Sequence, residues 1–276
     1  MGTAMTERLL EHGFRVRVWN RSPEKAELLI AAGAEWSDNP FSDCDRVIIS
    51  LYTTEVVEQV IEQLSVGLHA GLLLLDTTTG EPEMTAALGT RLGQLGVRYL
   101  DAPISGSSEQ TRRGEATVMV GGHRSDFAAC EDLWPILGHK TSYCGPCGSA
   151  AKMKLVSNLV LGLNRAALAE GLSFGSAIGL EPQAVLDVLR GSMAASRIMD
   201  TKGRKMIERD YAVQARLTQH LKDVRLMLDA AERLGLSLPL SAAHAELLEQ
   251  AEAAGFGAVD NSAVIEAYRG RDTEHG

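Results

Sequence analysis

Apolar and polar residues follow different patterns in the two halves of the chain. In the first half, short apolar runs bounded by turn residues alternate with segments of helical period. Four of these runs predict strands, namely Arg46–Leu51, Leu72–Leu75, Val97–Leu100 and Ala116–Val120. Runs that are apolar almost throughout are typical of strands buried on both faces of a parallel sheet. The first half is therefore predicted to be α/β, with a parallel sheet covered by helices.

The α/β pattern is incomplete at its start. Residues 2–13 have the period of a helix, residues 14–19 alternate as a strand, and Ser22 and Pro23 open a helix that ends at Gly33. A doubly wound sheet normally has a central strand and a glycine-rich turn before its first helix, but only Gly2 represents that turn here. We expect a first strand from about a dozen residues upstream, or another segment that fills the gap.

The second half of the chain predicts helices almost exclusively. Apolar residues recur at helical spacing over residues 149–179, 182–189 and 217–234. We place the domain boundary between residues 147 and 148. The prediction is a doubly wound α/β domain over residues 1–147, with its first strand truncated, and an all-helical domain over residues 148–276.

Composition and charge exclude several classes of protein. The 276 residues carry 36 acidic and 27 basic side chains, a net charge of −9, which opposes attraction to nucleic acid or anionic lipid. No apolar run approaches the roughly 20 residues of a membrane helix. Four cysteines are too few for a disulfide framework, and the seven histidines lack metal-ligand spacing. We therefore expect a cytoplasmic protein without a metal site, a nucleic-acid partner or a membrane partner.

The first cofactor signal is the sequence Asn20-Arg21-Ser22, about 20 residues after Gly2. In a dinucleotide-binding fold, an acid at this point binds the ribose 2′-hydroxyl of NAD, whereas arginine accommodates the 2′-phosphate of NADP. No acid is present, so NADP(H) is favoured over NAD. A solvated turn that happens to contain an arginine is the alternative.

Several motifs in a fixed order carry a resemblance to a known family. The segments are residues 1–5 (MGTAM), 18–22 (VWNRS), 76–79 (DTTT), 101–106 (DAPISG), 154–158 (KLVSN), 222–223 (KD) and 255–260 (GFGAVD). Together they resemble the β-hydroxyacid dehydrogenases, which include 3-hydroxyisobutyrate dehydrogenase, tartronate semialdehyde reductase and the glyoxylate/succinic semialdehyde reductases. The resemblance implies a Rossmann-like domain followed by a helical one. It also implies hydride transfer between NADP(H) and a small 3-hydroxy acid or semialdehyde.

The resemblance makes Lys154 the general acid/base. Interconversion of an alcohol and a carbonyl needs a group that exchanges a proton with the substrate oxygen, and lysine can do this if desolvation or nearby positive charge lowers its pKa. Asn158 lies four residues later on the same helical face and would hold the lysine or the substrate. A solvated helical lysine is the alternative, and Lys152 fits that description better.

Other implied site residues come from loops of the first half and from one helix of the second. Ser105 and Gly106 would bind the substrate carboxylate through backbone N–H groups, or else form only a tight turn. The implied cofactor-binding residues are Gly2, Met5, Asn20, Arg21, Ser22, Leu51, Thr79 and Lys222. Leu51 and Thr79 could serve packing alone, and Lys222 could be an exposed partner of Asp223. The active site is expected in the cleft between the domains of a homodimer or homotetramer.

Departures from the family pattern affect the predicted substrate. Ser157 stands where the family often has asparagine, Ala150 where glycine is common, and Ser107 where hydroxyisobutyrate enzymes have a second glycine after Ser-Gly. The substrate is therefore specified only as a small carboxylate-bearing molecule.

Three other hypotheses about the function compete with the dehydrogenase. Cys144 and Cys147 form a C-G-P-C sequence like that of thioredoxins, although the family has a Gly-Pro-x-Gly loop that residues 145–148 also fit. A non-catalytic relative of the NADP-binding fold would serve binding or assembly and would not be expected to bind NADPH. An imine-reducing relative would generally lack the lysine found at position 154.

Overall fold

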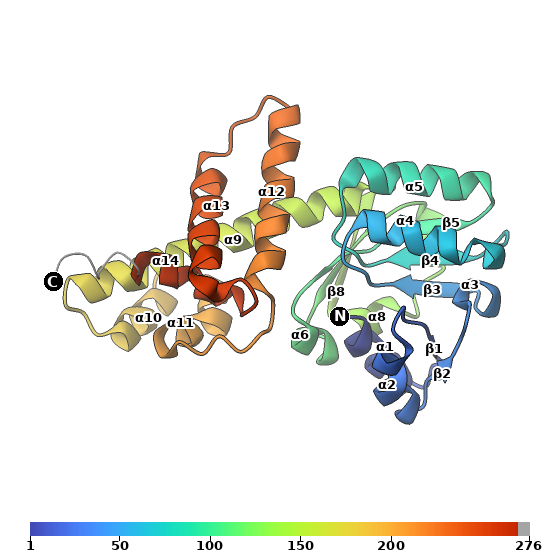
Figure 1. The fold of residues 1–276 in the computed structure, drawn as a ribbon, viewed down its shortest axis with the longest axis horizontal. Helices are drawn as coiled ribbons and strands as arrows, with labels where there is room; N and C mark the ends of the chain where they lie inside the picture. The colour runs from blue at the N-terminus through green and yellow to red at the C-terminus, as the bar shows by residue number, and fades with distance from the viewer. Residues whose placement is uncertain (270–276) are drawn as a thin grey trace. The chain divides into compact units, whose positions relative to one another are not determined.

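The computed structural model describes residues 1–269, which form two compact units. The first unit comprises residues 1–154 and the second begins at Leu155, whereas the sequence predicted a boundary after residue 147. Residues 270–276, the end of the predicted helical domain, lie outside the described part, and so does His275. The α/β class of the first half and the helical character of the second are confirmed (Figure 1).

The main sheet of the first unit has six strands in the order β3-β4-β5-β7-β6, with β8 also paired to β7. Its strands are β3 (Arg46–Ile49), β4 (Leu73–Asp76), β5 (Arg98–Asp101), β6 (Ile104–Ser105), β7 (Thr117–Gly121) and β8 (Lys140–Gly145). The strands β3, β4 and β5 are parallel, as predicted. The sheet becomes mixed after β5, because β7 runs antiparallel to both β5 and β6.

Helices cover both faces of this sheet (Figure 1). Leu73 and Leu75 pack with α1 (Gly2–Glu11) and α8 (Trp134–Leu137). Leu72 and Leu74 pack with α4 (Thr54–Gln63) and α5 (Pro82–Gln94). All four leucines are fully buried, which explains why residues 72–75 are apolar without alternation up to Asp76, the last residue of β4. The helices of the unit are α1 (Gly2–Glu11), η1 (Pro23–Ala26), α2 (Glu27–Ala31), α3 (Pro40–Asp43), α4 (Thr54–Gln63), η2 (Ser65–Gly67), α5 (Pro82–Gln94), α6 (Ser108–Arg112), α7 (Arg124–Ala128) and α8 (Trp134–Leu137).

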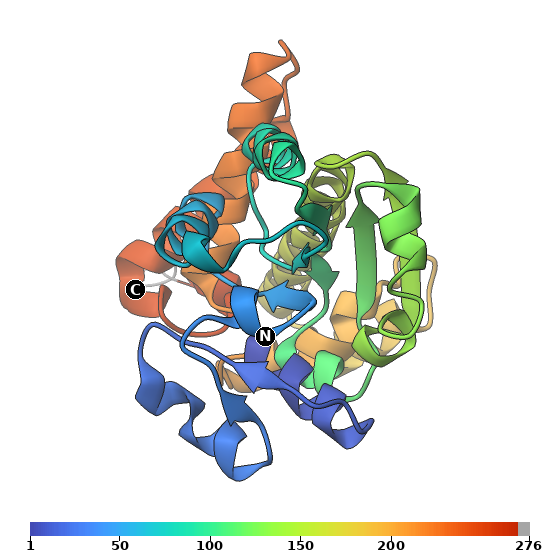
Figure 2. The ribbon, with the colours of Figure 1, turned by 90° about the vertical axis from the view of Figure 1, so that its right-hand side faces the viewer.

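A second, two-stranded sheet contains the chain that follows α1. It consists of β1 (Arg17–Val18) and β2 (Glu35–Trp36), which run parallel. The helix predicted after Ser22 is present as η1 and α2, although the Ser22 side chain makes no capping hydrogen bond. Within residues 1–269, no strand ladder joins β1 to β3 (Figure 2).

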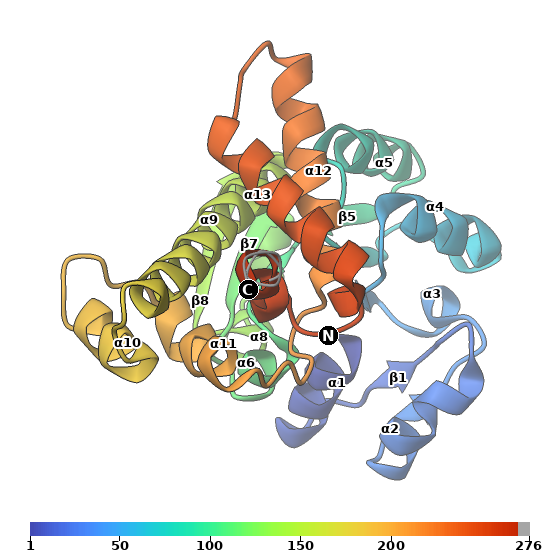
Figure 3. The same ribbon diagram turned by 60° about the vertical axis from the view of Figure 1, so that its left-hand side comes forward.

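The second unit is built from helices around one apolar core (Figure 3). Its elements are α9 (Ser149–Ala177), which begins in the first unit, α10 (Pro182–Arg190), η3 (Met199–Gly203), α11 (Arg204–Glu208), α12 (Leu217–Arg233), α13 (Pro239–Ala251), η4 (Glu252–Phe256), η5 (Asn261–Ile265) and α14 (Glu266–Arg269). Helices α12 and α13 lie side by side. The predicted helices over 149–179, 182–189 and 217–234 correspond to α9, α10 and α12.

Buried polar side chains cross the interior of the second unit. Arg165 on α9 and His244 on α13 are each 2% exposed, and the ring of His244 lies 5.1 Å from that of His220 on α12. Lys202 forms an ion pair of 2.8 Å with the fully buried Asp260. Burial, together with the charge of Arg165, lowers the pKa of His244 to about 4. His244 is therefore neutral in the folded protein at neutral pH.

We expect His244 to make the protein sensitive to mild acid. Its pKa is lower in the folded state than in the unfolded chain, so the unfolded chain takes up the proton first as the pH falls below about 6.5. The stability present at pH 7 should decrease by up to about 3 kcal/mol on approach to pH 4. Calorimetry of His244→Gln should show a smaller loss between pH 7 and 5. The exposed His123, changed to glutamine, is the control, and equal losses in both variants would contradict the assignment.

Candidate active site

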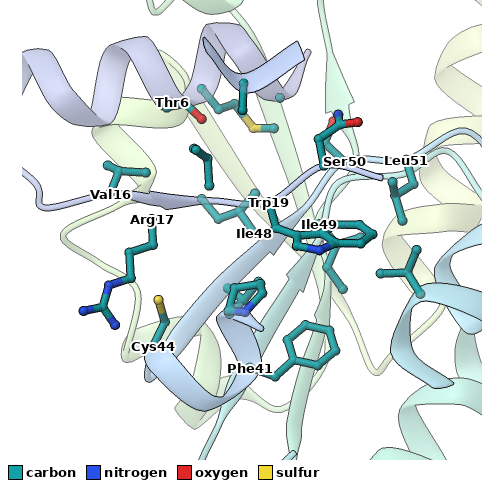
Figure 4. A pocket seen from close by; sticks show the side chains of 18 of the residues that line it. Thr6, Val16, Arg17, Trp19, Phe41, Cys44, Ile48, Ile49, Ser50 and Leu51 are labelled. Atoms are coloured by element: carbon teal, nitrogen blue, oxygen red, sulfur yellow. The ribbon is translucent and has the colours of Figure 1, made fainter. Parts of the chain in front are cut away.

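One cavity of about 890 Å³ in the first unit is lined by most of the predicted cofactor-binding residues. Figure 4 shows this cavity from close by, with Leu51 labelled. Gly2 and Met5 line it from α1, Asn20 and Arg21 from the chain after β1, and Leu51 from the chain after β3. Ser22 and Thr79 are not among its lining residues, and Lys222 belongs to the second unit. Five of the eight predicted residues therefore surround a single cavity.

The turn after β1 presents Arg21 to solvent. The side-chain oxygen of Asn20 accepts a hydrogen bond of 3.0 Å from the backbone N–H of Ser22, which fixes this turn. Arg21 is exposed and makes no hydrogen bond or ion pair with another residue of the described chain. Its guanidinium is therefore available to an anionic group such as a phosphate.

The loops after β3 and β4 are hydrogen-bonded to each other. The backbone N–H of Leu51 donates to the hydroxyl of Thr78 at 3.1 Å, and the hydroxyl of Thr77 donates to the carbonyl of Ile49 at 2.8 Å. Thr79 follows directly and is partly buried. The two loops at the carboxyl end of the parallel strands therefore hold Leu51 and Thr79 on one connected framework.

Lys154 lies beside the predicted substrate loop. Its amine donates a hydrogen bond of 2.8 Å to the backbone carbonyl of Ile104, and the residue is only 7% exposed. Ile104 directly precedes Ser105 and Gly106. A side chain at Gly106 would bring its Cβ within 3.1 Å of Ala116, at a φ of +156°, so glycine keeps this loop compact. The structure thus brings the predicted acid/base and the predicted carboxylate-binding loop together.

Asp101 holds the start of the helix that carries Lys154. Its two carboxylate oxygens accept hydrogen bonds from the backbone N–H groups of Gly148, at 3.0 Å, and Ala151, at 2.9 Å. Burial raises the pKa of Asp101 to about 6, although the backbone hydrogen bonds oppose that rise. The sequence motifs did not indicate a separate role for Asp101. An acid directly after an apolar strand is the signal that could have identified it.

Asn158 and Lys222 meet at a third residue, within the second unit. The side-chain amide of Asn158 donates to Asp223 at 3.0 Å, and the Lys222 amine forms an ion pair with the same carboxylate at 3.4 Å. Asp223 is 6% exposed. Because the amide nitrogen of Asn158 binds Asp223, its oxygen is oriented away from that carboxylate. Asp223 is thus a positioning residue for Asn158.

We expect Asp223→Ala to impair function through Asn158. Loss of a hydrogen bond to a buried charged group costs about 1.5–3 kcal/mol, which corresponds to roughly a tenfold to a hundredfold lower kcat/KM. Steady-state kinetics of Asp223→Ala and of Asp229→Ala, an exposed position on the same helix, test this. Equal kcat/KM in the two variants would show that the contact has no role in turnover.

The cysteine pair lacks the properties of a redox dithiol. Cys144 and Cys147 are free thiols. Burial raises the pKa of Cys147 to about 12, and burial also raises the pKa of Cys144. A reactive dithiol requires a lowered thiol pKa, because the thiolate is the nucleophile. The structure therefore favours the interpretation of residues 145–148 as a loop before α9.

Neither a metal-binding cluster nor a membrane-spanning helix is found in residues 1–269. No group of three or more histidine, cysteine, aspartate or glutamate side chains in this range could hold a metal ion. Within the same range, no helix is long and apolar enough to cross a membrane.

Comparison with known proteins identifies the family. Residues 1–145 match the model of the NAD-binding domain of 6-phosphogluconate dehydrogenase. Residues 148–268 match the model described as NAD-binding of NADP-dependent 3-hydroxyisobutyrate dehydrogenase. The chain belongs to the β-hydroxyacid dehydrogenase family. The resemblance inferred from the sequence motifs is thereby confirmed, and with it membership of an NAD(P)-binding family of oxidoreductases.

Individual relatives and solved structures show how far the similarity extends. Glyoxylate/succinic semialdehyde reductase 1 of Arabidopsis thaliana is 30% identical over 278 residues, which cover 98% of this chain and 95% of the relative. The cytokine-like nuclear factor N-PAC of Aedes aegypti is 32% identical over 94% of this chain, which spans about half, 48%, of that relative. The structure of Psf3 in complex with NADP⁺ and 2-OPP superposes with a TM-score of 0.87 at 25% identity, covering 96% of both chains.

Proposed function

We propose that this protein is a cytoplasmic oxidoreductase that transfers a hydride between NADP(H) and a small 3-hydroxy acid or semialdehyde. The observation that carries the proposal is the buried amine of Lys154, bound at 2.8 Å to the carbonyl of Ile104 beside Ser105 and Gly106. A proton-exchanging group next to a carboxylate-binding loop is what this reaction requires. Relatives named as semialdehyde reductases support the substrate class.

The residues around the cavity of the first unit fit NADP(H). The cavity of about 890 Å³ begins at Gly2 and extends past Asn20 and Arg21 to Leu51. Arg21 would bind the 2′-phosphate, because no carboxylate neutralises its guanidinium within the described chain. When bound, NADP(H) supplies the hydride chemistry. A structural relative solved with NADP⁺ supports this choice of cofactor.

Each substrate-binding group has a defined task in the proposal. Backbone N–H groups at Ser105 and Gly106 bind the substrate carboxylate, which places the adjoining hydroxyl or carbonyl near Lys154. The Lys154 amine gives a proton to the carbonyl oxygen during reduction and accepts it from the hydroxyl during oxidation. The Asn158 oxygen, oriented by Asp223, hydrogen-bonds the lysine or the substrate hydroxyl.

An assay of the purified chain against a set of small 3-hydroxy acids and semialdehydes tests the proposal. We expect NADPH oxidation with at least one semialdehyde, and a lower kcat/KM with NADH. A 3-hydroxy acid of the same carbon skeleton should reduce NADP⁺. Binding of NADPH without turnover of any compound in the set would contradict the proposed activity.

A non-catalytic function is the second candidate, because one relative at 32% identity is named as a nuclear factor rather than a dehydrogenase. NADPH fluorescence distinguishes the two candidates in two experiments. A binding titration shows whether NADPH binds, and a turnover assay shows whether it is oxidised. The presence of Lys154 favours the dehydrogenase. It also argues against an imine reductase, because imine-reducing relatives generally lack this lysine.

We further propose that the protein forms a homodimer or homotetramer. Val156, Val160 and Phe174 on α9 are each more than half exposed, and exposed apolar side chains gathered on one long helix are typical of an interface. We expect light scattering after size-exclusion chromatography to give two or four times the chain mass of 29.6 kDa. A single species of 29.6 kDa would contradict this proposal.

A further inference from the structure

The loop that carries Ser105 and Gly106 is held at both of its ends. Ser105 lies in β6 and is paired with Thr117 of β7. Ser107 caps the amino end of α6, and α6 packs on α1 (Figure 1). Gly106 is the single residue between these two anchors. The positions of the donors in this loop are therefore set by the surrounding structure.

Ser107 and Gln110 are joined by two reciprocal hydrogen bonds. The Ser107 hydroxyl accepts from the backbone N–H of Gln110 at 3.1 Å, and the side-chain oxygen of Gln110 accepts from the backbone N–H of Ser107 at 2.8 Å. The pair forms a complete capping box. The departure from the family pattern at position 107 matters here, because glycine has no hydroxyl that could accept from Gln110. The arrangement also engages the backbone N–H of Ser107, the donor that follows Gly106.

The same contact orients the other half of the Gln110 side-chain amide. Because its oxygen accepts from Ser107, its nitrogen is directed away from that N–H. The oxygen would lie 3.5 Å from a Cβ placed on Gly106, and the nitrogen is bonded to the same carbon, so it also lies beside this loop. Among residues 1–269, the nitrogen makes no hydrogen bond. Gln110 is only half-buried, so a ligand can reach its two N–H donors.

The charged side chains of α6 are engaged elsewhere. Arg113 pairs with Glu109 at 3.0 Å, and Arg112 pairs with Glu7 of α1 at 2.6 Å. Carboxylates thus balance both arginines. The long side chain of α6 that presents donors to the loop is therefore the neutral one of Gln110.

We propose that Gln110 is a substrate-binding residue whose amide nitrogen donates a hydrogen bond to the substrate carboxylate, in place of the backbone N–H of Ser107. The inference rests on the proposed function for the presence of a carboxylate at Ser105 and Gly106. It adds a side-chain donor to the backbone donors of that loop, and it explains how the loop binds an acid although Gln110 occupies the N–H of Ser107.

This role of Gln110 predicts a preference between an acid and its uncharged analogue. A hydrogen bond to an ionised acceptor is about twice as strong as one between neutral groups. The Gln110 amide should therefore favour a 3-hydroxy acid over the corresponding carboxamide, whose oxygen carries no charge. This preference depends on the nitrogen of Gln110, whereas the capping of α6 depends on its oxygen.

Gln110→Glu separates these two roles. One glutamate oxygen can still accept from Ser107 and keep the capping box, but the second replaces the donor with a negative charge. The probes are 3-hydroxypropionate and 3-hydroxypropionamide, titrated by calorimetry into the protein with excess NADPH. Because the hydroxy acid and NADPH are both reduced, no turnover takes place. We expect the Kd of the acid to rise about tenfold or more, and that of the amide to stay within a factor of about two.

Two further variants separate loss of the donor from electrostatic repulsion. Gln110→Met removes the donor without adding charge, and its side chain still covers the Ser107 N–H. It should raise the Kd of the acid about tenfold and that of the amide less. Gln94→Glu makes the same change as Gln110→Glu at an exposed position of α5 and should leave both Kd values unchanged.

Three outcomes would overturn the inference about Gln110. They are unchanged acid binding in Gln110→Met, equal weakening of acid and amide binding in the variants of Gln110, and failure of the acid to bind the unmodified protein. Acid binding that depends on Gln110, without turnover of any semialdehyde, would contradict the proposed activity alone, because the calorimetric readout requires no reaction.

Discussion

Lys154→Ala is expected to lower kcat by about 10² to 10⁴, the usual contribution of a positioned acid/base. The side chain is 7% exposed and its amine is held at 2.8 Å from the Ile104 carbonyl, at the edge of the loop proposed to bind the substrate. Alanine removes the proton-exchanging group without touching the cavity that contains Arg21 and Gly2. The measurement is steady-state turnover, combined with an NADPH fluorescence titration that should give a nearly unchanged Kd.

Lys152→Ala is the matched control for Lys154→Ala. Lys152 lies on the same helix two residues earlier but is exposed, so its loss should leave kcat within a factor of about two of the unmodified protein. Similar kcat values for the two variants would remove Lys154 from the proposed mechanism. Circular dichroism of both variants separates a loss of chemistry from a loss of folding.

Arg21→Glu should have the second largest effect, and its effect should fall on cofactor choice. A charge-assisted hydrogen bond to the 2′-phosphate is worth about 1.5–3 kcal/mol, and glutamate adds repulsion, so NADPH affinity should fall about 100-fold. Glutamate can also accept from the ribose 2′-hydroxyl of NADH, which has no 2′-phosphate. The ratio of kcat/KM for NADPH to that for NADH should therefore fall below one.

A graded series isolates the charge at position 21. Arg21→Gln should lie between the unmodified protein and Arg21→Glu, because glutamine removes the positive charge without adding a negative one. Lys140→Glu introduces a charge reversal at an exposed residue of β8 and should leave the NADPH preference unchanged. Equal use of NADPH and NADH by the unmodified protein would contradict the role of Arg21.

The sequence predicted those helices and strands that can be recognised from the pattern of their own residues. The apolar runs around β4 and β5 mark their strands because both faces of each are almost wholly buried, whereas β3 is equally apolar although most of its residues are only half-buried. The helical period from residue 149 onward predicted α9 closely. The reversal of β7 relative to β5 was not predicted. A short apolar run looks the same whichever way its neighbour runs, since direction depends on connections through the rest of the sheet.

In the candidate site too, the sequence predicted relations between neighbouring residues but not contacts between distant ones. The spacing of Lys154 and Asn158 predicted that they share a helical face, because that relation depends on four residues alone. Their hydrogen-bond partners are distant in sequence. Ile104 lies 50 residues before Lys154, and Asp223 lies 65 residues after Asn158. Such contacts arise from tertiary packing, so the motifs alone did not indicate that Asp101 and Asp223 orient the proposed machinery.

Because α9 is one continuous helix with fixed contacts at its first turn and near its middle, the number of residues between those contacts is more constrained than the identity of its exposed residues. Its first turn is fixed by Asp101, and further along the helix a Cβ at Gly162 would meet ring atoms of His220 and His244 at 2.6 and 2.7 Å. Each residue advances an α-helix by about 100°. One residue inserted between positions 154 and 158 would turn every later side chain of α9 by that angle. Substitutions on its exposed side should therefore accumulate readily during evolution, whereas insertions and deletions in this stretch should be eliminated.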